Sequence, residues 1–330
     1  MNPPHGIVDG LLKTVLQSHG ESMPDSYNEI ASRKQIHFMK RNKNMRKKLF
    51  TGITILVLAL VMVVPVGAIT NHWTEDNDHP FVGLVVFYDS DGVFVQRCTG
   101  SLISPTKFLT AGHCTAANAG VVTARVYFQQ DAGAHFDPVT EIDPVTGYPE
   151  FCAAGTLGTL CATSDKLYNF GYPAGFPDTG DAGLVILDQA IQLPEYGQLP
   201  AAGALNGLST ARGQKDAVFT VSGYGLSYKT QVHSAVPNIS FRIRLMAPST
   251  LVNLNSGLTD GFNLQTQGNG SDRGGTCSGD SGGPVFLDGP DSNIIVAVTS
   301  FGLNALCRGT DFAYRVDRAE VLDWINNPVR

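Results

Sequence analysis

The sequence predicts an all-β fold that ends in a single helix. Glycine and proline are abundant, with 36 and 18 residues in a chain of 330, which favours many turns over long helices. Short apolar runs recur from residue 81 onward, and several of them alternate with polar residues, as half-buried strands do. Clusters of Gly, Pro, Asn and Asp separate the runs, a spacing typical of β-sandwiches and β-barrels.

The expected strands follow in chain order. Residues 81–88 form an apolar run that predicts a buried strand. Residues 122–129 and residues 239–246 each alternate with period two, so each is expected to form one half-buried strand. Shorter apolar runs predict further strands at 184–187, 218–222 and 294–299.

The final element is expected to be an amphipathic helix. Asp317 is predicted to cap it, with Glu320 three residues later completing a capping box. The apolar face would be formed by Val321, Leu322, Trp324 and Ile325. Residues 131–180 are rich in Gly and Pro and show little periodicity, so we expect a long surface insertion there.

Composition and charge exclude some classes of protein and of binding partner. The hydrophobic fraction of 43% and charged fraction of 16% suit a packed core and argue against a disordered or coiled-coil chain. Residues 1–50 carry nine Lys and Arg against four Asp and Glu, whereas residues 51–330 carry fourteen against twenty-five. The acidic body argues against nucleic acid as a partner, because phosphate binding needs clustered positive charge.

The basic head leads into a targeting segment. Residues 45–48 read Met-Arg-Lys-Lys, an apolar run follows at 53–64, and Val66-Gly67-Ala68 supplies small residues. These are the three parts of a secretory signal peptide, so we expect residues 45–68 to be removed after Ala68 and the protein to be secreted. The run is shorter than the about 20 residues of a membrane-spanning helix.

Two alternatives stay open at this end of the chain. A generous count over residues 49–69 is long enough for a signal anchor, which would hold the protein at a membrane. Residues 1–44 are either an upstream extension before a true start at Met45 or a cytoplasmic tail.

All six cysteines follow the apolar run, which suggests disulfides in an exported protein. Six cysteines allow 15 pairings, and the sequence does not choose among them. The alternatives are reduced thiols in a cytosolic enzyme and, more weakly, a zinc site. No C-x-x-C or H-x₃-H spacing supports zinc, and we expect no metal and no cofactor.

Three short segments could carry chemistry, at residues 109–114, 180–187 and 277–284. In the third, Ser281 stands among glycines, which let backbone N–H groups converge on a developing oxyanion. A serine hydroxyl needs a histidine as base, and that histidine needs an acid to orient it. His113 and Asp181 in the other two segments would supply them. Each residue alone is ordinary in a turn or strand end, and it is their combination that favours catalysis.

These segments resemble the motifs of the chymotrypsin/trypsin-like serine proteases. Thr110-Ala111-Gly112-His113-Cys114 is similar to the histidine motif, and Gly279-Asp280-Ser281-Gly282-Gly283-Pro284 to the serine motif. Gly180-Asp181-Ala182-Gly183-Leu184-Val185 resembles the aspartate motif, with Gly183 where an aliphatic residue is usual. The closest similarity is to bacterial secreted trypsin-like enzymes.

The order of the three residues in the chain separates this family from its rivals. An α/β-hydrolase needs its histidine after the serine, whereas the last histidine here is His233. A subtilisin-type order would require Asp89 or Asp91 as the acid, and the β-rich pattern and the cysteines argue against that fold.

The resemblance implies a fold and a domain plan. It predicts two six-stranded antiparallel β-barrels with a C-terminal helix. Residues 69–195 would form the first barrel, with His113 and Asp181, and residues 196–330 the second, with Ser281 and the helix. The implied disulfides are Cys98–Cys114 and Cys277–Cys307, while Cys152–Cys161 would lie in the insertion.

The resemblance also implies residue roles. The backbone N–H groups of Gly279 and Ser281 would form the oxyanion hole. A new N-terminus at Ile69 would pair with Asp280. Substrate would meet the residues Gly275, Ser300, Phe301, Gly302 and Asp311. Because Gly275 stands where trypsin has an acid, preference for Arg or Lys would depend on Asp311, and a neutral pocket is the alternative.

The sequence thus predicts a secreted, monomeric serine endopeptidase that acts on proteins or peptides through a Ser281 acyl-enzyme. A catalytically silent binding or adhesion module on the same fold is the alternative. Contact with a membrane is expected only if the signal segment is retained.

Overall fold

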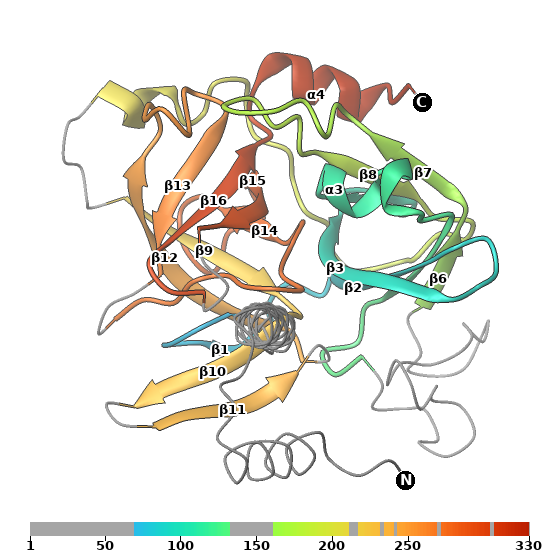
Figure 1. Cartoon of the computed structure of the whole chain (residues 1–330), viewed down its shortest axis with the longest axis horizontal. Coiled ribbons are helices and arrows are strands. Elements are labelled where there is room, and N and C mark those ends of the chain that lie inside the picture. Colours follow the sequence, from blue (N-terminus) through green and yellow to red (C-terminus); the bar gives the residue numbers. More distant parts are fainter. Residues whose placement is uncertain are drawn as a thin grey trace, which may run out of the picture. The chain divides into compact units, whose positions relative to one another are not determined.

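The structure is a computed structural model that describes residues 69–132, 161–210, 217–231, 234–240, 243–268, 272–303 and 307–329. All of them lie in one structural unit, residues 66–330. Its strands form two seven-stranded antiparallel sheets that lie side by side, together with a separate hairpin (Figure 1). The targeting segment at 45–68 and residues 1–44 lie outside the described residues.

The first sheet carries the N-terminal half of the fold. Its order is β6-β5-β2-β3-β4-β8-β7. The two end strands, β6 and β7, are separated only by Asp165, so they act as one bent strand that nearly closes a six-stranded barrel. The strands are β2 (Val82–Tyr88), β3 (Phe94–Leu102), β4 (Lys107–Thr110), β5 (Thr123–Tyr127), β6 (Cys161–Ser164), β7 (Lys166–Asn169) and β8 (Gly183–Ile186).

The second sheet closes fully. Its order is β1-β12-β13-β16-β15-β14-β9, and β12 also pairs with β9, so six strands form a barrel to which β1 adds at one side. The strands are β1 (Thr74–Glu75), β9 (Val218–Gly223), β12 (Leu245–Asn253), β13 (Asn263–Gln267), β14 (Pro284–Phe286), β15 (Ile295–Gly302) and β16 (Thr310–Arg315).

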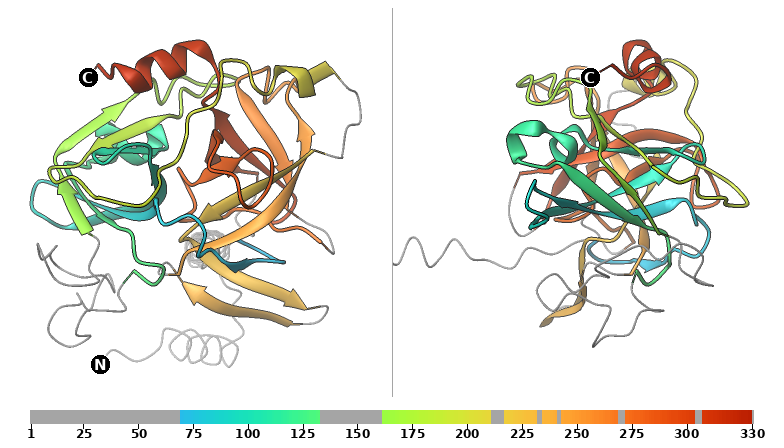
Figure 2. Two further views of the ribbon diagram at one scale, coloured as in Figure 1. Left: turned by 180° about the vertical axis from the view of Figure 1, so that it is seen from behind. Right: turned by 90° about the vertical axis from the view of Figure 1, so that its right-hand side faces the viewer.

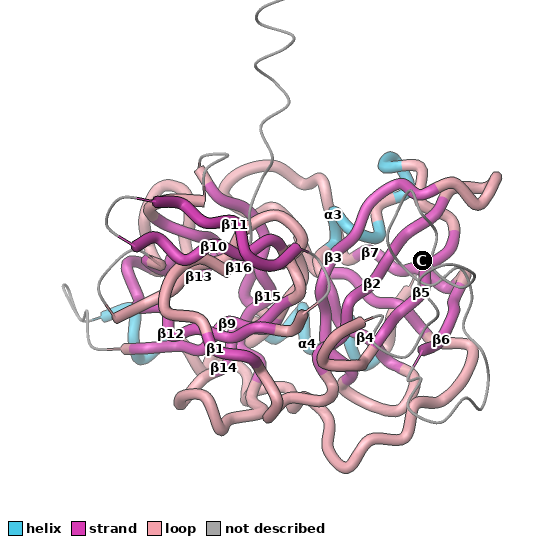
Figure 3. The backbone as a smooth tube through the Cα atoms, turned by 90° about the horizontal axis from the view of Figure 1, so that it is seen from below, coloured by secondary structure: helices cyan, strands magenta, loops and turns pink. Residues whose placement is uncertain are grey.

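A hairpin of β10 (Leu226–Gln231) and β11 (Ser234–Ser240) pairs with neither sheet and lies on the side of the second one (Figure 3). Helices are few and short in the described residues. They are α3 (Gly112–Thr115), α4 (Ala319–Asn326) and the 3₁₀ turns η1 (Ala117–Ala119) and η2 (Asn206–Thr210). None of them has the length and apolar character that crossing a membrane requires.

The C-terminal helix α4 lies on the outside of the molecule (Figure 2). Val321, Trp324 and Ile325 join the same apolar core as the first sheet, and Lys107 of β4 donates from Nζ to the carbonyls of Ile325 and Asn326 at 3.1 and 2.9 Å. A second core fills the other barrel. The prediction of two β-barrels with a C-terminal helix is therefore confirmed.

The predicted helix cap is wrong. The helix begins after Arg318, and no side chain caps it. Asp317 is instead fully buried, where it accepts hydrogen bonds from the Arg315 guanidinium at 2.7 and 2.8 Å and from the Leu205 N–H. A buried arginine needs an acceptor for its charge, and that demand outweighs the capping preference of Asp317.

Two further expectations need correction. Residues 239–246 do not form one strand, because β11 ends at Ser240 and β12 begins at Leu245. Between them, the buried Arg244 side chain donates to the carbonyls of Asp76, Val82 and Phe128, a role that the period-two pattern hides. The expected insertion at 131–180 is also too long, since residues 161–169 form β6 and β7. Residues 133–160, including Cys152, lie outside the described residues.

Candidate active site

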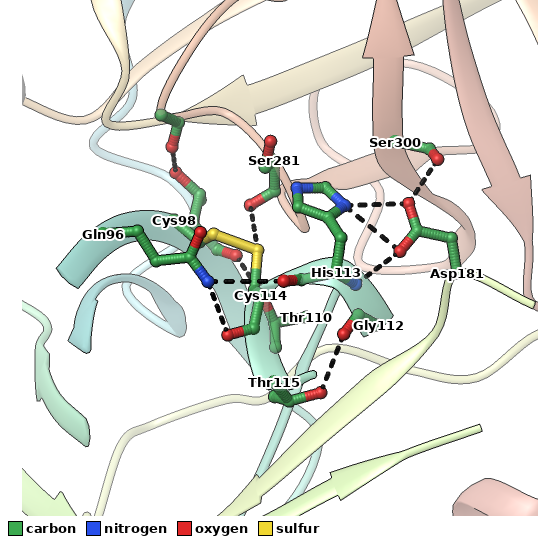
Figure 4. The surroundings of a disulfide bond; sticks show 12 residues. Gln96, Cys98, Thr110, Gly112, His113, Cys114, Thr115, Asp181, Ser281 and Ser300 are labelled. Atoms are coloured by element: carbon green, nitrogen blue, oxygen red, sulfur yellow. Dashed lines mark hydrogen bonds and ion pairs between the residues drawn. A yellow bond between two sulfur atoms is a disulfide. The ribbon is translucent and has the colours of Figure 1, made fainter. Parts of the chain in front are cut away.

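His113 is carried on α3, a helix of one turn that follows β4 directly. β4 pairs with β8, and Asp181 lies two residues before β8 begins. The register therefore places the carboxylate of Asp181 beside the histidine. Asp181 Oδ2 lies 2.9 Å from His113 Nδ1, and the backbone N–H of His113 donates to Asp181 Oδ1 at 2.7 Å (Figure 4).

The environment of Asp181 keeps it ionised. Burial alone would raise its pKa, but the charge of His113, its ring hydrogen bond and its backbone N–H, together with the Ser300 hydroxyl, lower the pKa below the usual value of 3.8. An ionised carboxylate only accepts hydrogen bonds, so Nδ1 of His113 must carry the proton. In the neutral imidazole the other ring nitrogen is then the acceptor, and it lies on the side of Ser281 (Figure 4).

The loop that carries Ser281 is shaped by the first sheet. Thr99 of β3 donates from its backbone N–H to the Ser281 carbonyl and from its hydroxyl to the Gly279 carbonyl, both at 2.8 Å. Gly282 has a φ of +80°, and a Cβ there would lie 2.1 Å from Thr110 Oγ1. Glycine therefore permits the contact between this loop and the residues just before His113.

Some backbone N–H groups of the Ser281 loop have hydrogen-bond partners within the protein, and others do not. The N–H groups of Asp280, Gly282 and Gly283 bind the carbonyls of Cys277, Thr299 and Asp280. Within the described residues, those of Gly279 and Ser281 donate to no protein group. Nor does a hydrogen bond join the Ser281 hydroxyl to His113 there. Such contacts are often loose before substrate binds.

Two disulfides brace the site. Cys98–Cys114 ties β3 to the helix of His113, and Cys277–Cys307 ties the segment before Ser281 to the segment before β16. Cys161 is also disulfide-bonded, and Cys152, its expected partner, lies outside the described residues. Cys98, Cys114 and His113 are close enough for metal ligation, but sulfurs in a disulfide are not thiolates and cannot serve as zinc ligands.

A pocket of about 490 Å³ opens beside Ser281. Asp311 of β16 lines it, is 7% exposed and accepts the Thr276 N–H at 2.8 Å. Burial raises the pKa of Asp311 to about 7, and the hydrogen bonds from Thr276 only partly offset this. Asp311 also lies beside Gly275, since a Cβ on Gly275 would be 2.5 Å from Asp311 Oδ2. The pocket is further lined by residues 276–278, Ser281, 299–303 and Cys307.

Ile69 and Asp280 are also brought together. Ile69 is fully buried, and its backbone N–H donates to the Asp280 carboxylate. The next residue, Thr70, exchanges two backbone hydrogen bonds with Gly275, at 2.8 and 3.0 Å. Burial raises the pKa of Asp280 to about 7, and the charge of Asp311 adds to this, while the N–H groups of Gly225, Cys277 and Ile69 lower it.

Sequence reasoning missed several residues that complete the site. Gln96 of β3 donates to the carbonyls of His113 and Cys114, and the Tyr172 ring packs edge-on against His113 with centroids 5.8 Å apart. Phe176 packs on Phe301, a residue already expected to meet substrate, and Phe312 stacks on the same ring. These residues come from a loop and from strand positions with no local motif, so no signal in a single sequence marks them.

Comparisons with known proteins agree with this geometry. A family model described as Trypsin matches residues 69–325. Brachyurin of Leptuca pugilator is 30% identical over 230 residues, which cover 69% of this chain and 85% of brachyurin. Serine protease 7 of Drosophila melanogaster is 27% identical over 273 residues, 78% of this chain. CLIP domain-containing serine protease B15 of Anopheles gambiae is 24% identical over 275 residues, 76% of this chain. The matches span 63% and 66% of these last two relatives' own length.

Solved structures support the fold. The structure described as HL collagenase superposes with a TM-score of 0.53 at 19% identity and covers 81% of this chain and all of that one. A mutant of human heparin binding protein gives a TM-score of 0.52 at 20% identity and covers 78% and 98% of the two chains. The family model covers most of the chain, and the sequence relatives are serine proteases. The chain therefore belongs to the trypsin family of serine proteases.

Proposed function

We propose that this protein is an active serine endopeptidase in which Ser281 is the nucleophile, His113 the general base and acid, and Asp181 the residue that orients His113. The observation that carries the proposal is the paired hydrogen bonding of Asp181 to the ring and the backbone of His113. It fixes the tautomer in which the ring can accept a proton on the Ser281 side. A binding module would have no need of this arrangement.

The proposed reaction has two halves. His113 accepts the proton of the Ser281 hydroxyl while Ser281 Oγ attacks the peptide carbonyl, and the tetrahedral intermediate collapses when His113 returns that proton to the leaving amine. Water then repeats the sequence on the acyl-enzyme and restores Ser281. The unused N–H groups of Gly279 and Ser281 would bind the oxyanion, and one such donor contributes about 3–4 kcal/mol to lowering the barrier.

Membership of this family makes a protein or peptide the substrate class. We further propose that the pocket beside Ser281 takes the side chain before the cleaved bond and that Asp311 gives it a preference for Arg or Lys. Asp311 lines the pocket and is nearly buried, so a cation entering there would meet a carboxylate shielded from water. Ser300, Phe301 and Gly302 line the same pocket, which supports a role in holding the substrate chain.

Processing is the third part of the proposal. Removal of residues 45–68 during export would leave Ile69 as the N-terminus, and its ammonium would then replace the N–H that now donates to Asp280. The buried position of Ile69 and its contact with Asp280 support this. Mass spectrometry of the secreted protein tests it, since an active form that begins well after Ile69 would exclude export cleavage as the activating step.

The function itself is tested by labelling with a serine-directed fluorophosphonate. The processed protein is expected to be labelled at Ser281 and to hydrolyse peptide substrates, while Ser281→Ala, with the same fold and disulfides, should do neither. Absence of labelling in correctly processed protein would contradict the proposal and favour the silent binding module.

A further inference from the structure

We propose that Asn169 is a positioning residue for His113, acting through the backbone of α3 and through the ring of Tyr172. The inference rests on the proposed role of His113 as the catalytic base. Asn169 is the last residue of β7 and belongs to none of the three motifs in the sequence. Its side chain nevertheless joins the strand, the histidine helix and the loop that covers the imidazole.

The short helix α3, which carries His113, depends on hydrogen bonds from outside the helix. The last four carbonyls of an α-helix have no partner within the helix, and α3 has only four residues. Its carbonyls therefore need partners from elsewhere, and side-chain amides supply them from two directions. Gln96 donates to the carbonyls of His113 and Cys114, at 3.3 and 3.0 Å, and Asn169 donates to the carbonyl of Gly112 at 3.2 Å.

The side-chain amides of Gln96 and Asn169 contact opposite ends of α3, and these ends differ in how else they are held. The end of α3 that Gln96 contacts is also fastened by the Cys98–Cys114 disulfide. The Gly112 end is held by the Thr115 hydroxyl at 3.2 Å, which comes from within the same turn, and by Asn169. Asn169 is thus one of three links from this end of α3 to the rest of the first sheet. The others are the Thr115 hydroxyl, which also donates to the Tyr168 carbonyl at 2.9 Å, and Asp181, which accepts the His113 N–H.

Asn169 also shapes the loop above the histidine. Its Oδ1 accepts the N–H groups of Gly171 and Tyr172 at 3.0 and 2.9 Å, and its Nδ2 donates to the Tyr172 carbonyl at 3.0 Å. One side chain therefore makes four hydrogen bonds, and three of them fix Tyr172 or the residue before it. A side chain with both donors and an acceptor at this length is required, which is the chemistry of asparagine.

Tyr172, which Asn169 fixes in place, contacts the imidazole of His113 and so restricts its orientation. Its ring meets the His113 ring edge-on, with centroids 5.8 Å apart, while the hydrogen bonds to Asp181 hold the Nδ1 edge of the same ring. The loop also lies tight on α3, since a Cβ on Gly112 would be 3.0 Å from the Tyr172 Cβ. Releasing Tyr172 would leave the imidazole free to tilt about its contact with Asp181, and misplacement of about 1 Å can cost about 100-fold in rate.

Asn169→Ala tests the proposal. We expect kcat to fall about 10- to 100-fold while KM changes less than about twofold, because the imidazole and not the substrate pocket loses its support. Asn293→Ala is the matched control. Asn293 also donates from a side-chain amide, to Glu195 at 2.8 Å on the exposed surface, and its loss should leave kcat unchanged.

A second readout does not depend on catalysis. The proton between His113 Nδ1 and Asp181 should give a low-field NMR resonance that is sharp in the parent protein and broadened by exchange with water in Asn169→Ala. Asn169→Asp keeps the two acceptor contacts and loses both donor contacts, so it should show the same changes if Asn169→Ala fails to fold.

Parent-like kcat together with a parent-like resonance in either folded variant would overturn the proposal. So would a rise in KM with unchanged kcat, since that would assign Tyr172 and Asn169 to substrate binding instead. If the parent protein shows no hydrolysis, the proposed function fails, but the resonance still reports whether Asn169 positions His113.

Discussion

Gly275 and Asp311 fit together only because Gly275 has no side chain: a Cβ atom there would lie 2.5 Å from Asp311 Oδ2. The carboxylate therefore reaches the pocket from β16 across a position that any other residue would block. An acid attached at 275 and an acid attached at 311 exclude one another, and this chain has the second arrangement.

Replacing Asp311 by Asn should therefore change specificity. The variant keeps the shape and the hydrogen bond from Thr276, which Oδ1 of Asn can accept, but it loses the charge. We expect kcat/KM for substrates with Arg or Lys before the cleaved bond to fall about 10- to 100-fold, the value of a charge-assisted hydrogen bond. Cleavage after apolar residues should change little. Profiling with a peptide library measures both, and equal preference for Arg and Lys in parent and variant would refute the role of Asp311.

The same residue predicts a pH-dependent specificity. Burial raises the pKa of Asp311 to about 7, so the pocket is neutral below this pH and negative above it. The ratio of kcat/KM for a lysine substrate to that for a norleucine substrate should rise as the pH increases through 7 and fall as it decreases. Taking the ratio cancels any pH dependence of the chemical step that the two substrates share. A ratio that is flat from pH 5.5 to 8.5 would contradict the prediction.

Asp181→Asn tests the orientation of His113. Asparagine has almost the same shape, but its amide group can donate toward Nδ1 and so stabilise the tautomer that cannot accept a proton from Ser281. We expect kcat to fall by about 10⁴-fold with the fold retained, as judged by circular dichroism. A loss of less than tenfold in the folded variant would mean that Asp181 does not set the tautomer.

Stability of the unprocessed chain should depend on Asp280. Its pKa is raised to about 7 in the folded protein, against 3.8 when unfolded, so the folded state binds more protons between these values. The contribution of Asp280 to stability should therefore increase as the pH is lowered from about 7 to about 4, and level off below. Asp181 and Asp76 act oppositely, but their lowered pKa values confine their effect to pH below about 4.

Thermal unfolding of a Ser281→Ala chain that retains residues 1–68 measures this. The additional change Asp280→Asn should reduce the slope between pH 4 and 7 without abolishing it, because Asp311 has a similarly raised pKa. An unchanged slope would show that Asp280 is already ionised in the uncleaved protein.

The two-barrel fold could be predicted because its evidence is local. Strand alternation, turn residues and three short motifs each occupy a few consecutive positions, and the family resemblance supplied the topology. The expected strands at 81–88, 184–187, 218–222 and 294–299 correspond to β2, β8, β9 and β15 within two or three residues at each end.

The failures involve partners that are distant in sequence. Asp317 does not cap the helix, because it accepts hydrogen bonds from the charged Arg315 side chain. Arg244 interrupts a predicted strand, because its side chain donates to backbone carbonyls more than 100 residues away. Asn169 and Gln96 lie outside all motifs for the same reason. An amide that binds backbone carbonyls has no sequence pattern of its own, so only the folded chain identifies it.

The hydrogen bonds from Thr99 to Gly279 and Ser281 have a consequence for how the molecule can be divided. The loop that carries Ser281 is held in shape partly by a strand of the other barrel. A fragment made of the second barrel alone would keep the Ser281 hydroxyl but lose β3, whose Thr99 holds the loop around Ser281 by two hydrogen bonds. Reassembly from separated halves should therefore restore reactivity toward the fluorophosphonate only when β3 docks.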